Sequence, residues 1–313
     1  MHKTIYKTAI FTFLALLCIS CSDNFDTQSE SESSRMVLNS VFAPGELLNV
    51  HLATTRKILN PDSKISNITS ADVEITDNKT SVVYRLNHVG EGNYQSDDFR
   101  PSFGGSYSVI AHAEGFRSVE ATSSVPVQAF VTQTDVYQGD FSESGDMREL
   151  FVNLEFYSEA TETQYYIWEI INEDRPTSNT FDFNDVADGP VLLYSEDSRT
   201  ESVLADESFQ TRVFLVDDGS QGLVQTSFVT MTDPVIAFQF GDDTDEDADV
   251  LLKVRAMTVS KDLYEYFKSI EIYRLRGEIN SSITQPVDIY SNVEGGLGIF
   301  GGLTSEILNI ELN

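Results

Sequence analysis

Hydrophobic and polar residues alternate along the first third of the chain, which is the pattern of half-buried β-strands. Val73 and Ile75, for example, are separated by Glu74. Gly, Pro, Asn and Asp occupy the breaks, where they favour turns. We expect strands at 36–42, 47–54, 71–76, 81–86, 92–96, 107–113 and 116–124. Seven short strands without a helical pattern predict an immunoglobulin-like or transthyretin-like sandwich over residues 35–126.

Two residues indicate how this sandwich is arranged. Tyr107 is a candidate tyrosine corner with its hydroxyl bonded to the backbone, or else a core aromatic. Pro126 has no backbone N–H and therefore ends the strand pairing, which makes it a suitable domain boundary.

Strand-like segments continue through a larger second domain, residues 127–313. The polar stretches 172–188 and 194–208 are expected to be surface loops. The predicted fold class is therefore all-β, with two domains. The strands expected here are 130–137, 150–156, 165–171, 191–194, 213–216, 226–230, 235–240 and 250–258.

One helix is predicted in the second domain, over residues 260–276, where it would cover one sheet or plug one end of a barrel. Ser260 is a suitable N-cap and Gly277 a suitable C′ residue. The pairs Glu265–Lys268 and Glu271–Arg274 are expected on its exposed side. Its apolar face consists of Leu263, Tyr266, Phe267, Ile270 and Tyr273.

A glycine-rich segment follows this helix. Five glycines fall within residues 295–302, and Leu297, Ile299 and Phe300 are set among them. Glycine permits positive φ angles and close backbone approach, so we expect a tight closing loop over 291–302. The three apolar side chains should pin this loop to the second domain. A phosphate loop is disfavoured because the ending Lys-Ser/Thr is missing.

The first 20 residues predict a signal peptide of the lipoprotein type. Lys3 and Lys7 give it a positive start, and the apolar stretch 9–19 is too short to anchor it across a bilayer. Cys21 follows a small residue, as in a bacterial lipobox, and is the candidate lipidation site. Cleavage of an ordinary secretory peptide nearby is the alternative. The Ser- and Glu-rich segment 21–34 predicts a flexible acidic tether.

Acidic residues dominate the composition, and the formal net charge is −30. Without Lys3 and Lys7 the mature chain has 18 basic and 50 acidic residues, a charge of −32. Such a surface repels phosphate groups, so a nucleic-acid partner is excluded. Attachment to a membrane should come from acyl chains rather than from a basic patch.

The end of the chain resembles a known family. The residues that carry the resemblance are the helix 263–269, Pro286-Val287 and the segment 291–301. They are similar to the carboxyl-terminal signature of a Bacteroidota outer-membrane lipoprotein family of unknown function, the domain-of-unknown-function 4249 family. The structural signature residues are Ser291, Asn292, Gly295, Gly296, Gly298 and Phe300.

The resemblance implies a place and a role. It implies a lipid-anchored protein of the outer membrane, and the acidic residues after Cys21 resemble a surface-export signal. It also implies an accessory or ligand-capture subunit of a TonB-dependent receptor. The alternative is a structural or assembly component of the envelope without a small-molecule ligand. No catalytic residues carry over from the family.

The acidic run 242–249 is the candidate cation site. Asp243, Asp245, Asp247 and Asp249 alternate, so an extended backbone would gather their carboxylates as oxygen ligands for Ca²⁺. The alternative is a solvated turn between two strands. No other cofactor is expected.

The available side chains argue against an enzyme. His51, His88 and His112 all belong to the predicted first domain, and neither a His-x-x-x-His pair nor a Gly-x-Ser-x-Gly elbow is present. Carboxylates are numerous, but no feature singles out the pair that a glycosidase needs. A hydrolase is therefore the weakest of the alternatives.

Overall fold

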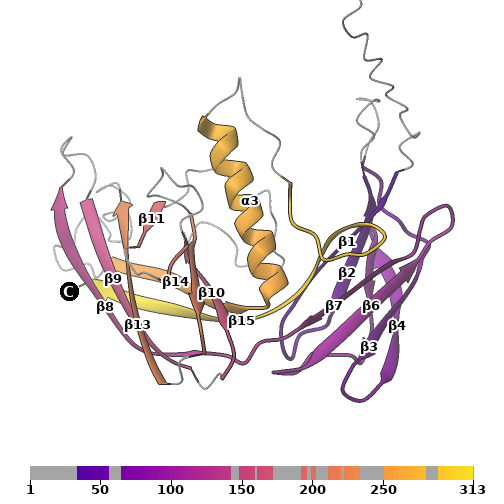
Figure 1. The fold of residues 1–313 in the computed structure, drawn as a ribbon, viewed down its shortest axis with the longest axis horizontal. Coiled ribbons are helices and arrows are strands. Elements are labelled where there is room, and N and C mark those ends of the chain that lie inside the picture. The colour runs from indigo at the N-terminus through magenta and orange to yellow at the C-terminus, as the bar shows by residue number, and fades with distance from the viewer. Residues whose placement is uncertain are drawn as a thin grey trace, which may run out of the picture.

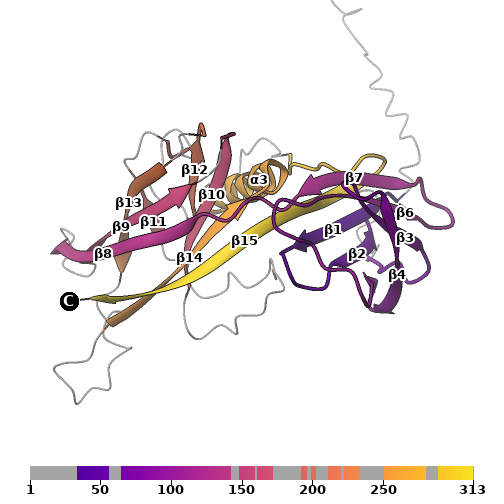
Figure 2. The same ribbon diagram turned by 90° about the horizontal axis from the view of Figure 1, so that it is seen from below.

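The computed structural model describes residues 34–55, 65–141, 148–158, 161–171, 192–195, 199–201, 211–219, 222–232, 250–279 and 288–312. They form an eleven-stranded mixed sheet, a four-stranded sheet and one helix. The large sheet runs through two bodies that lie side by side (Figures 1 and 2). The described fold is therefore mostly β, as the sequence predicts.

The first body contains the strands from the first third of the chain. Buried and half-exposed residues alternate along them because one side of each strand faces a shared core. The large sheet orders these strands β1-β2-β5-β4-β3-β6-β7. They are β1 (Met36–Phe42), β2 (Asn49–Thr54), β3 (Asp72–Asp77), β4 (Val82–Gly90), β5 (Asn93–Gln95), β6 (Ser106–His112) and β7 (Val119–Ser124).

Tyr107 lies in the core of this body with 2% of its surface exposed. Its hydroxyl accepts a hydrogen bond from the backbone N–H of Ser102 at 2.8 Å. This is the backbone bond expected of a tyrosine corner, and it ties the turn before β6 to the core.

The second body is a sandwich of two sheets. Strands β12, β10, β14 and β15 belong to the large sheet, and the small sheet has the order β11-β13-β9-β8. Tyr166 and Trp168 on β10 pack against Phe156 on β9. The strands are β8 (Phe130–Phe141), β9 (Arg148–Ser158), β10 (Gln164–Ile171), β11 (Leu192–Tyr194), β12 (Val213–Asp217), β13 (Gly222–Thr232), β14 (Val250–Val259) and β15 (Leu297–Leu312).

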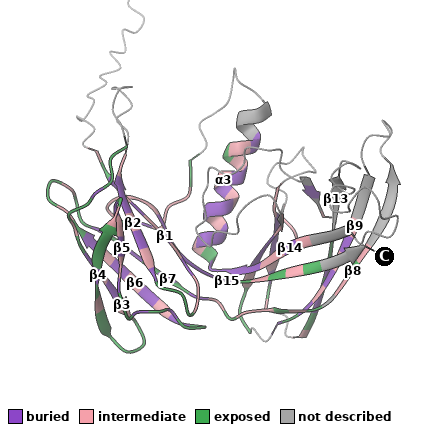
Figure 3. Cartoon of the chain, turned by 180° about the vertical axis from the view of Figure 1, so that it is seen from behind, coloured by how far each residue is buried: buried purple, intermediate pink, exposed green. Residues whose placement is uncertain are grey.

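The helix α3 (Lys261–Ile279) covers the other face of this part of the large sheet (Figure 3). Ser260 caps it, since the Oγ atom of Ser260 accepts from the N–H of Leu263 at 3.4 Å. The helix continues through Gly277, which the sequence predicts as its end. Ile167 on β10 faces the helix, whereas its neighbours face the small sheet, because successive residues of a strand point to opposite sides.

The last strand, β15, belongs to both bodies. Leu297–Gly302 pairs in parallel with β1, from Val37 to Phe42. From Leu303 onward β15 pairs with β14 in antiparallel fashion. The predicted closing loop 291–302 is therefore a strand from Leu297 onward, because β1 offers this backbone an open edge of donors and acceptors.

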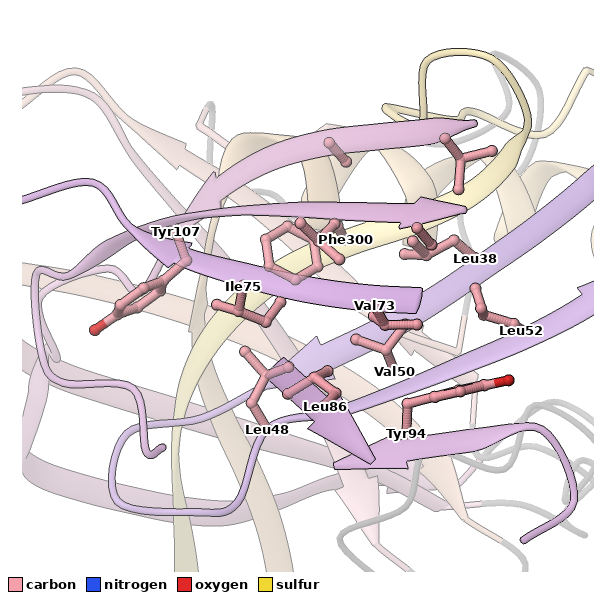
Figure 4. Packing of buried hydrophobic residues seen from close by; sticks show 14 of the residues in the cluster. Leu38, Leu48, Val50, Leu52, Val73, Ile75, Leu86, Tyr94, Tyr107 and Phe300 are labelled. Atoms are coloured by element: carbon pink, nitrogen blue, oxygen red, sulfur yellow. The ribbon is translucent and has the colours of Figure 1, made fainter. Parts of the chain in front are cut away.

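The side chains at the start of β15 also divide between the two bodies. Phe300 is fully buried in the first body, where its ring centroid lies 4.6 Å from that of Phe42 (Figure 4). Ile299 and Leu303 instead join the cluster under α3. The expected attachment to the second domain alone thus differs from the structure, because consecutive side chains point to opposite sides of the strand.

The residues just before β15 form hydrogen bonds with β7, the last strand of the first body. Glu294 and Glu120 exchange backbone hydrogen bonds of 2.8 and 3.1 Å. At Gly302 a Cβ atom would lie 2.3 Å from the carbonyl oxygen of Ser124, so the two backbones are in direct contact. The C-terminal segment therefore lies between β1 and β7, at opposite ends of the first body's strand order.

Phe300→Ala should destabilise the protein by ~3 kcal/mol or more, because the truncation leaves a cavity in the first body's core. Chemical denaturation measures the change. Phe103 is 60% exposed, so Phe103→Ala is the matched control and should shift stability by only about 0.5 kcal/mol. Equal effects of the two substitutions would contradict the packing of Phe300.

Candidate functional site at the closing segment and the helix

The candidate site residues fall into two groups. Cys21 and the four carboxylates Asp243, Asp245, Asp247 and Asp249 lie outside the described residues. The six signature residues lie within 288–302, which we call the closing segment. The structure brings these six together at the junction of β1, β7, α3 and β15.

Asn292 acts as a side-chain partner for the start of β15. Its Nδ2 donates to the carbonyl oxygen of Phe300 at 2.8 Å, and the N–H of Phe300 donates to its Oδ1 at 3.0 Å. A carboxamide has both a donor and an acceptor, so it can bond to the backbone N–H and C=O of one strand residue, as a neighbouring strand would. Nearby, the Oγ atom of Ser291 accepts from the N–H of Val293 at 3.3 Å.

The signature glycines allow backbones to touch. Gly298 has φ +119°, and a Cβ there would lie 2.0 Å from the carbonyl oxygen of Leu38. Gly295 has φ +79°, and its Cβ would lie 2.3 Å from the carbonyl oxygen of Ser118. Both positions demand glycine on conformational and on steric grounds. Gly295 and Gly298 therefore allow the closing segment to pack closely against the neighbouring backbones, which is a structural role.

Tyr290 fastens the closing segment to α3. Its hydroxyl donates to Oδ1 of Asp262 at 2.6 Å, and its backbone N–H donates to Oγ of Ser269 at 3.0 Å. Burial and this hydrogen bond raise the pKa of the Tyr290 hydroxyl. Asp262 lies in the first turn of the helix, where the macrodipole favours a negative charge.

A chain of alternating charges joins α3 to the sheet beneath it. Glu169 on β10 accepts from Arg255 and from Arg212, each at 2.9 Å. The Nη1 atom of Arg212 lies 4.0 Å from Oε2 of Glu271 on the helix. Oε1 of Glu271 accepts a hydrogen bond from Arg274 at 2.9 Å. The guanidinium of Arg212 also lies over the ring of Phe267, 5.2 Å from its centroid. We call these five residues the ion chain: Glu169, Arg212, Arg255, Glu271 and Arg274.

Glu271 is the most enclosed member of the ion chain, with 1% of its side chain exposed. Burial alone would raise the pKa of its carboxyl, but hydrogen bonds from Arg274 and Thr211 outweigh burial and lower it. The expected exposed pair Glu271–Arg274 exists, but it is buried rather than solvated. Lys268 was expected to pair with Glu265, but its Nζ atom instead contacts Oε2 of Glu201 at 2.5 Å.

A second enclosed carboxyl lies between the two sheets of the second body. Asp217 is 1% exposed, and its Oδ2 has no hydrogen-bond partner within the described part of the chain. Burial and the neighbouring Asp218 raise the pKa of Asp217. Burial also raises the pKa of Tyr166 to about 12, and the Tyr166 hydroxyl donates to Ser158 at 3.3 Å. Groups enclosed between two sheets cannot reach a substrate in this arrangement.

Sequence reasoning predicted the pair Glu271–Arg274 but missed the rest of the ion chain and the Asp262–Tyr290 bond. The i,i+3 spacing of Glu271 and Arg274 was a visible signal. Their burial was not visible, because Thr211 and Arg212 come from a distant part of the chain. Within the described residues no group of three or more His, Cys, Asp or Glu side chains is placed to hold a metal ion. Among these residues, no helix has the length and apolar character needed to cross a membrane.

Comparison with known families decides the relationship of the chain. A family model described as "Domain of unknown function (DUF4249)" matches residues 22–306. The chain belongs to the DUF4249 family. The resemblance of its C-terminal signature is thereby confirmed, and in this DUF4249 protein the signature forms the junction between the two bodies. No curated protein matches the chain.

Three solved structures show a distant likeness to the chain. Alpha-2-macroglobulin of Escherichia coli activated by porcine elastase aligns at TM-score 0.20 and 11% identity, over 91% of this chain and 22% of its own. The BSP domain of a biofilm-associated protein aligns at TM-score 0.21 and 6% identity, over 88% of this chain and 59% of its own. A chain from the complex of Dpr2 Ig1–Ig2 with DIP-Theta Ig1–Ig3 aligns at TM-score 0.18 and 8% identity, over 72% of this chain and 92% of its own. The chain thus spans less than two thirds of the first two matched chains.

Glu271→Gln should destabilise the DUF4249 protein by about 3 kcal/mol at neutral pH, because it removes a fully buried charge and leaves the partly buried Arg212 and Arg274 without it. The matched control is Glu74→Gln, since Glu74 pairs with Arg85 at 3.0 Å on the surface, where an ion pair contributes about 0–1 kcal/mol. Urea denaturation of both variants measures the difference. Equal losses would contradict the buried role of Glu271.

The same pair of variants gives a pH signature. The folded pKa of Glu271 is lowered, so its contribution is complete above the ordinary carboxyl value of 4.5 and disappears as pH falls through the folded pKa. The stability gap between wild type and Glu271→Gln should therefore narrow in acid. A gap that widens as pH falls would show that the carboxylate is not stabilised by its neighbours.

Proposed function

We propose that this DUF4249 protein is a non-enzymatic lipoprotein of the outer membrane, anchored through Cys21 at the cell surface. In this proposal it serves a TonB-dependent receptor as an accessory or ligand-capture subunit. The observation that carries the proposal is that the ionisable side chains described above form contacts within the chain itself. The carboxylates at the closing segment and the ion chain bind the chain to itself, which suits a rigid binding protein better than a catalyst.

The position of the tether supports the anchoring part of this proposal. Chain continuity joins segment 21–34 to the end of the first body where β1 begins at Met36. Fourteen residues between Cys21 and Met36 extend by at most about 50 Å. A lipid on Cys21 would therefore hold both bodies close to the membrane, within reach of a membrane-embedded partner.

The finer description of the first body is also part of the proposal. We infer that it is an immunoglobulin-like sandwich of strands β1 to β7, to which the start of β15 adds one more strand beside β1. The antiparallel pairing of β3 with β4 and β6, and of β6 with β7, supports this description. The Tyr107 hydroxyl bond supports it as well.

Cys21→Ala should release the protein from the membrane fraction, because the acylated residue is lost. Cys18→Ala is the matched control and should leave the anchoring unchanged, since Cys18 belongs to the predicted signal peptide. Fractionation of cells and immunoblotting measure the distribution. Membrane retention of Cys21→Ala, or release of Cys18→Ala, would contradict the predicted lipidation site.

Affinity purification of the full lipidated protein from detergent-solubilised membranes tests the partner. Recovery with one TonB-dependent receptor is the expected result. Recovery with general envelope assembly factors would replace this function with a structural or assembly role. Recovery of the protein alone would contradict both.

A further inference from the structure

Three large apolar side chains form a row on the outer face of the small sheet. Tyr157 on β9 pairs directly with Phe130 on β8 and with Leu223 on β13. Directly opposed residues of neighbouring strands point to the same side of a sheet. The exposed fractions are 59% for Phe130, 46% for Tyr157 and 56% for Leu223. The adjacent residues Phe156 and Val224 face the core instead, so the row points to solvent.

Polar residues continue the same face beyond the row. Glu155 and Gln225 pair in register two residues along, and the Gln225 Nε2 donates to the Glu155 carboxylate at 2.8 Å. Asn153 and Ser227 pair two residues further along. The face therefore combines an apolar row with amide, hydroxyl and carboxylate groups. Strands β8, β9 and β13 lie side by side in Figures 1 and 2.

The size of the row limits what can bind to it. Neighbouring strands are about 4.8 Å apart, so three side chains span about 10 Å. A large side chain offers about 150–250 Å², and three half-exposed ones present about 300 Å². A stable protein–protein interface needs about 800 Å² from each partner. The row alone is thus too small for a second copy or for a folded protein, and it suits a short ligand.

The charge of the face limits the chemistry of the ligand. Glu155 adds a carboxylate beside the row, and the chain carries a formal charge of −30. Phosphate-bearing and other anionic ligands are repelled by such a surface. A ligand that fits both parts of this face is neutral, with apolar faces for the aromatic rings and hydroxyl groups for the amide and carboxylate. Sugar rings have both, since their C–H groups are attracted to the negative face of an aromatic ring.

We propose that the outer face of the small sheet binds a neutral oligosaccharide. Phe130 and Tyr157 supply stacking surfaces, Leu223 extends the apolar row, and Glu155 and Gln225 bind hydroxyl groups. The oligosaccharide site rests on the exposed side chains of one sheet and is independent of the receptor association proposed above. Binding to soluble glycan and recovery of a receptor can therefore fail separately.

Affinity electrophoresis of the tether-free mature chain tests the site, with starch, mixed-linkage β-glucan, xylan and mannan as neutral probes. At least one neutral polysaccharide should retard the wild type, whereas anionic alginate should not. Phe130→Ala/Tyr157→Ala should weaken that retardation at least tenfold. The matched control is Phe103→Ala/Tyr273→Ala, because Phe103 and Tyr273 are 60% and 62% exposed away from the small sheet. The control should bind as the wild type does.

Thermal melting verifies that each variant is folded, and the single variants Phe130→Ala and Tyr157→Ala replace the double variant if it melts early. The proposal is overturned if no neutral polysaccharide retards the wild type, or if the row variants bind unchanged. Retardation by alginate alone would overturn the charge argument and with it the ligand class. Light scattering that shows a dimer lost in the row variants, without glycan binding, would assign the face to a second copy.

Discussion

Backbone hydrogen bonds along one strand hold the two bodies of this protein together. The first part of β15 pairs with β1, the first strand that the structure describes, and the remainder pairs with β14. Because this single strand is shared by the two bodies, the ladder of the large sheet is continuous from one body to the other. The first body therefore depends on residues that are synthesised about 260 positions after β1, and its edge at β1 stays open until they arrive.

The family signature is best explained by this sharing. Asn292 supplies the hydrogen bonds that Phe300 would otherwise lack, and Gly298 allows the close approach to β1. Tyr290 attaches the same segment to α3, and the ion chain attaches α3 to the sheet. Each contact restricts how one body can sit on the other. The signature thus describes an architectural junction, while the exposed face of the small sheet remains available for a ligand.

Much of this fold follows from local patterns in the sequence. Alternation predicts β1, β3, β6 and most other strands of the first body within a few residues, and Ser260 marks the start of α3. The strand character of residues 297–302 could not be predicted, because glycines weaken strand propensity and the partner β1 lies about 260 residues away. The burial of Glu271 was hidden for the same reason, since Thr211 and Arg212, which lie against it, come from the segment before β12, about 60 residues away. The apolar row of Phe130, Tyr157 and Leu223 could not be predicted either, because it depends on the register of three strands.

Native-state hydrogen exchange as a function of denaturant tests the shared strand most directly. If β15 joins the bodies, the slowest amides of β1, around Leu38, and of β14, around Val254, should exchange through one common opening with the same free energy and denaturant dependence. The Gly298→Ala variant should lower the protection of both strands together. Exchange of β1 through an opening that leaves β14 protected would contradict the account, because the bodies would then unfold as independent domains.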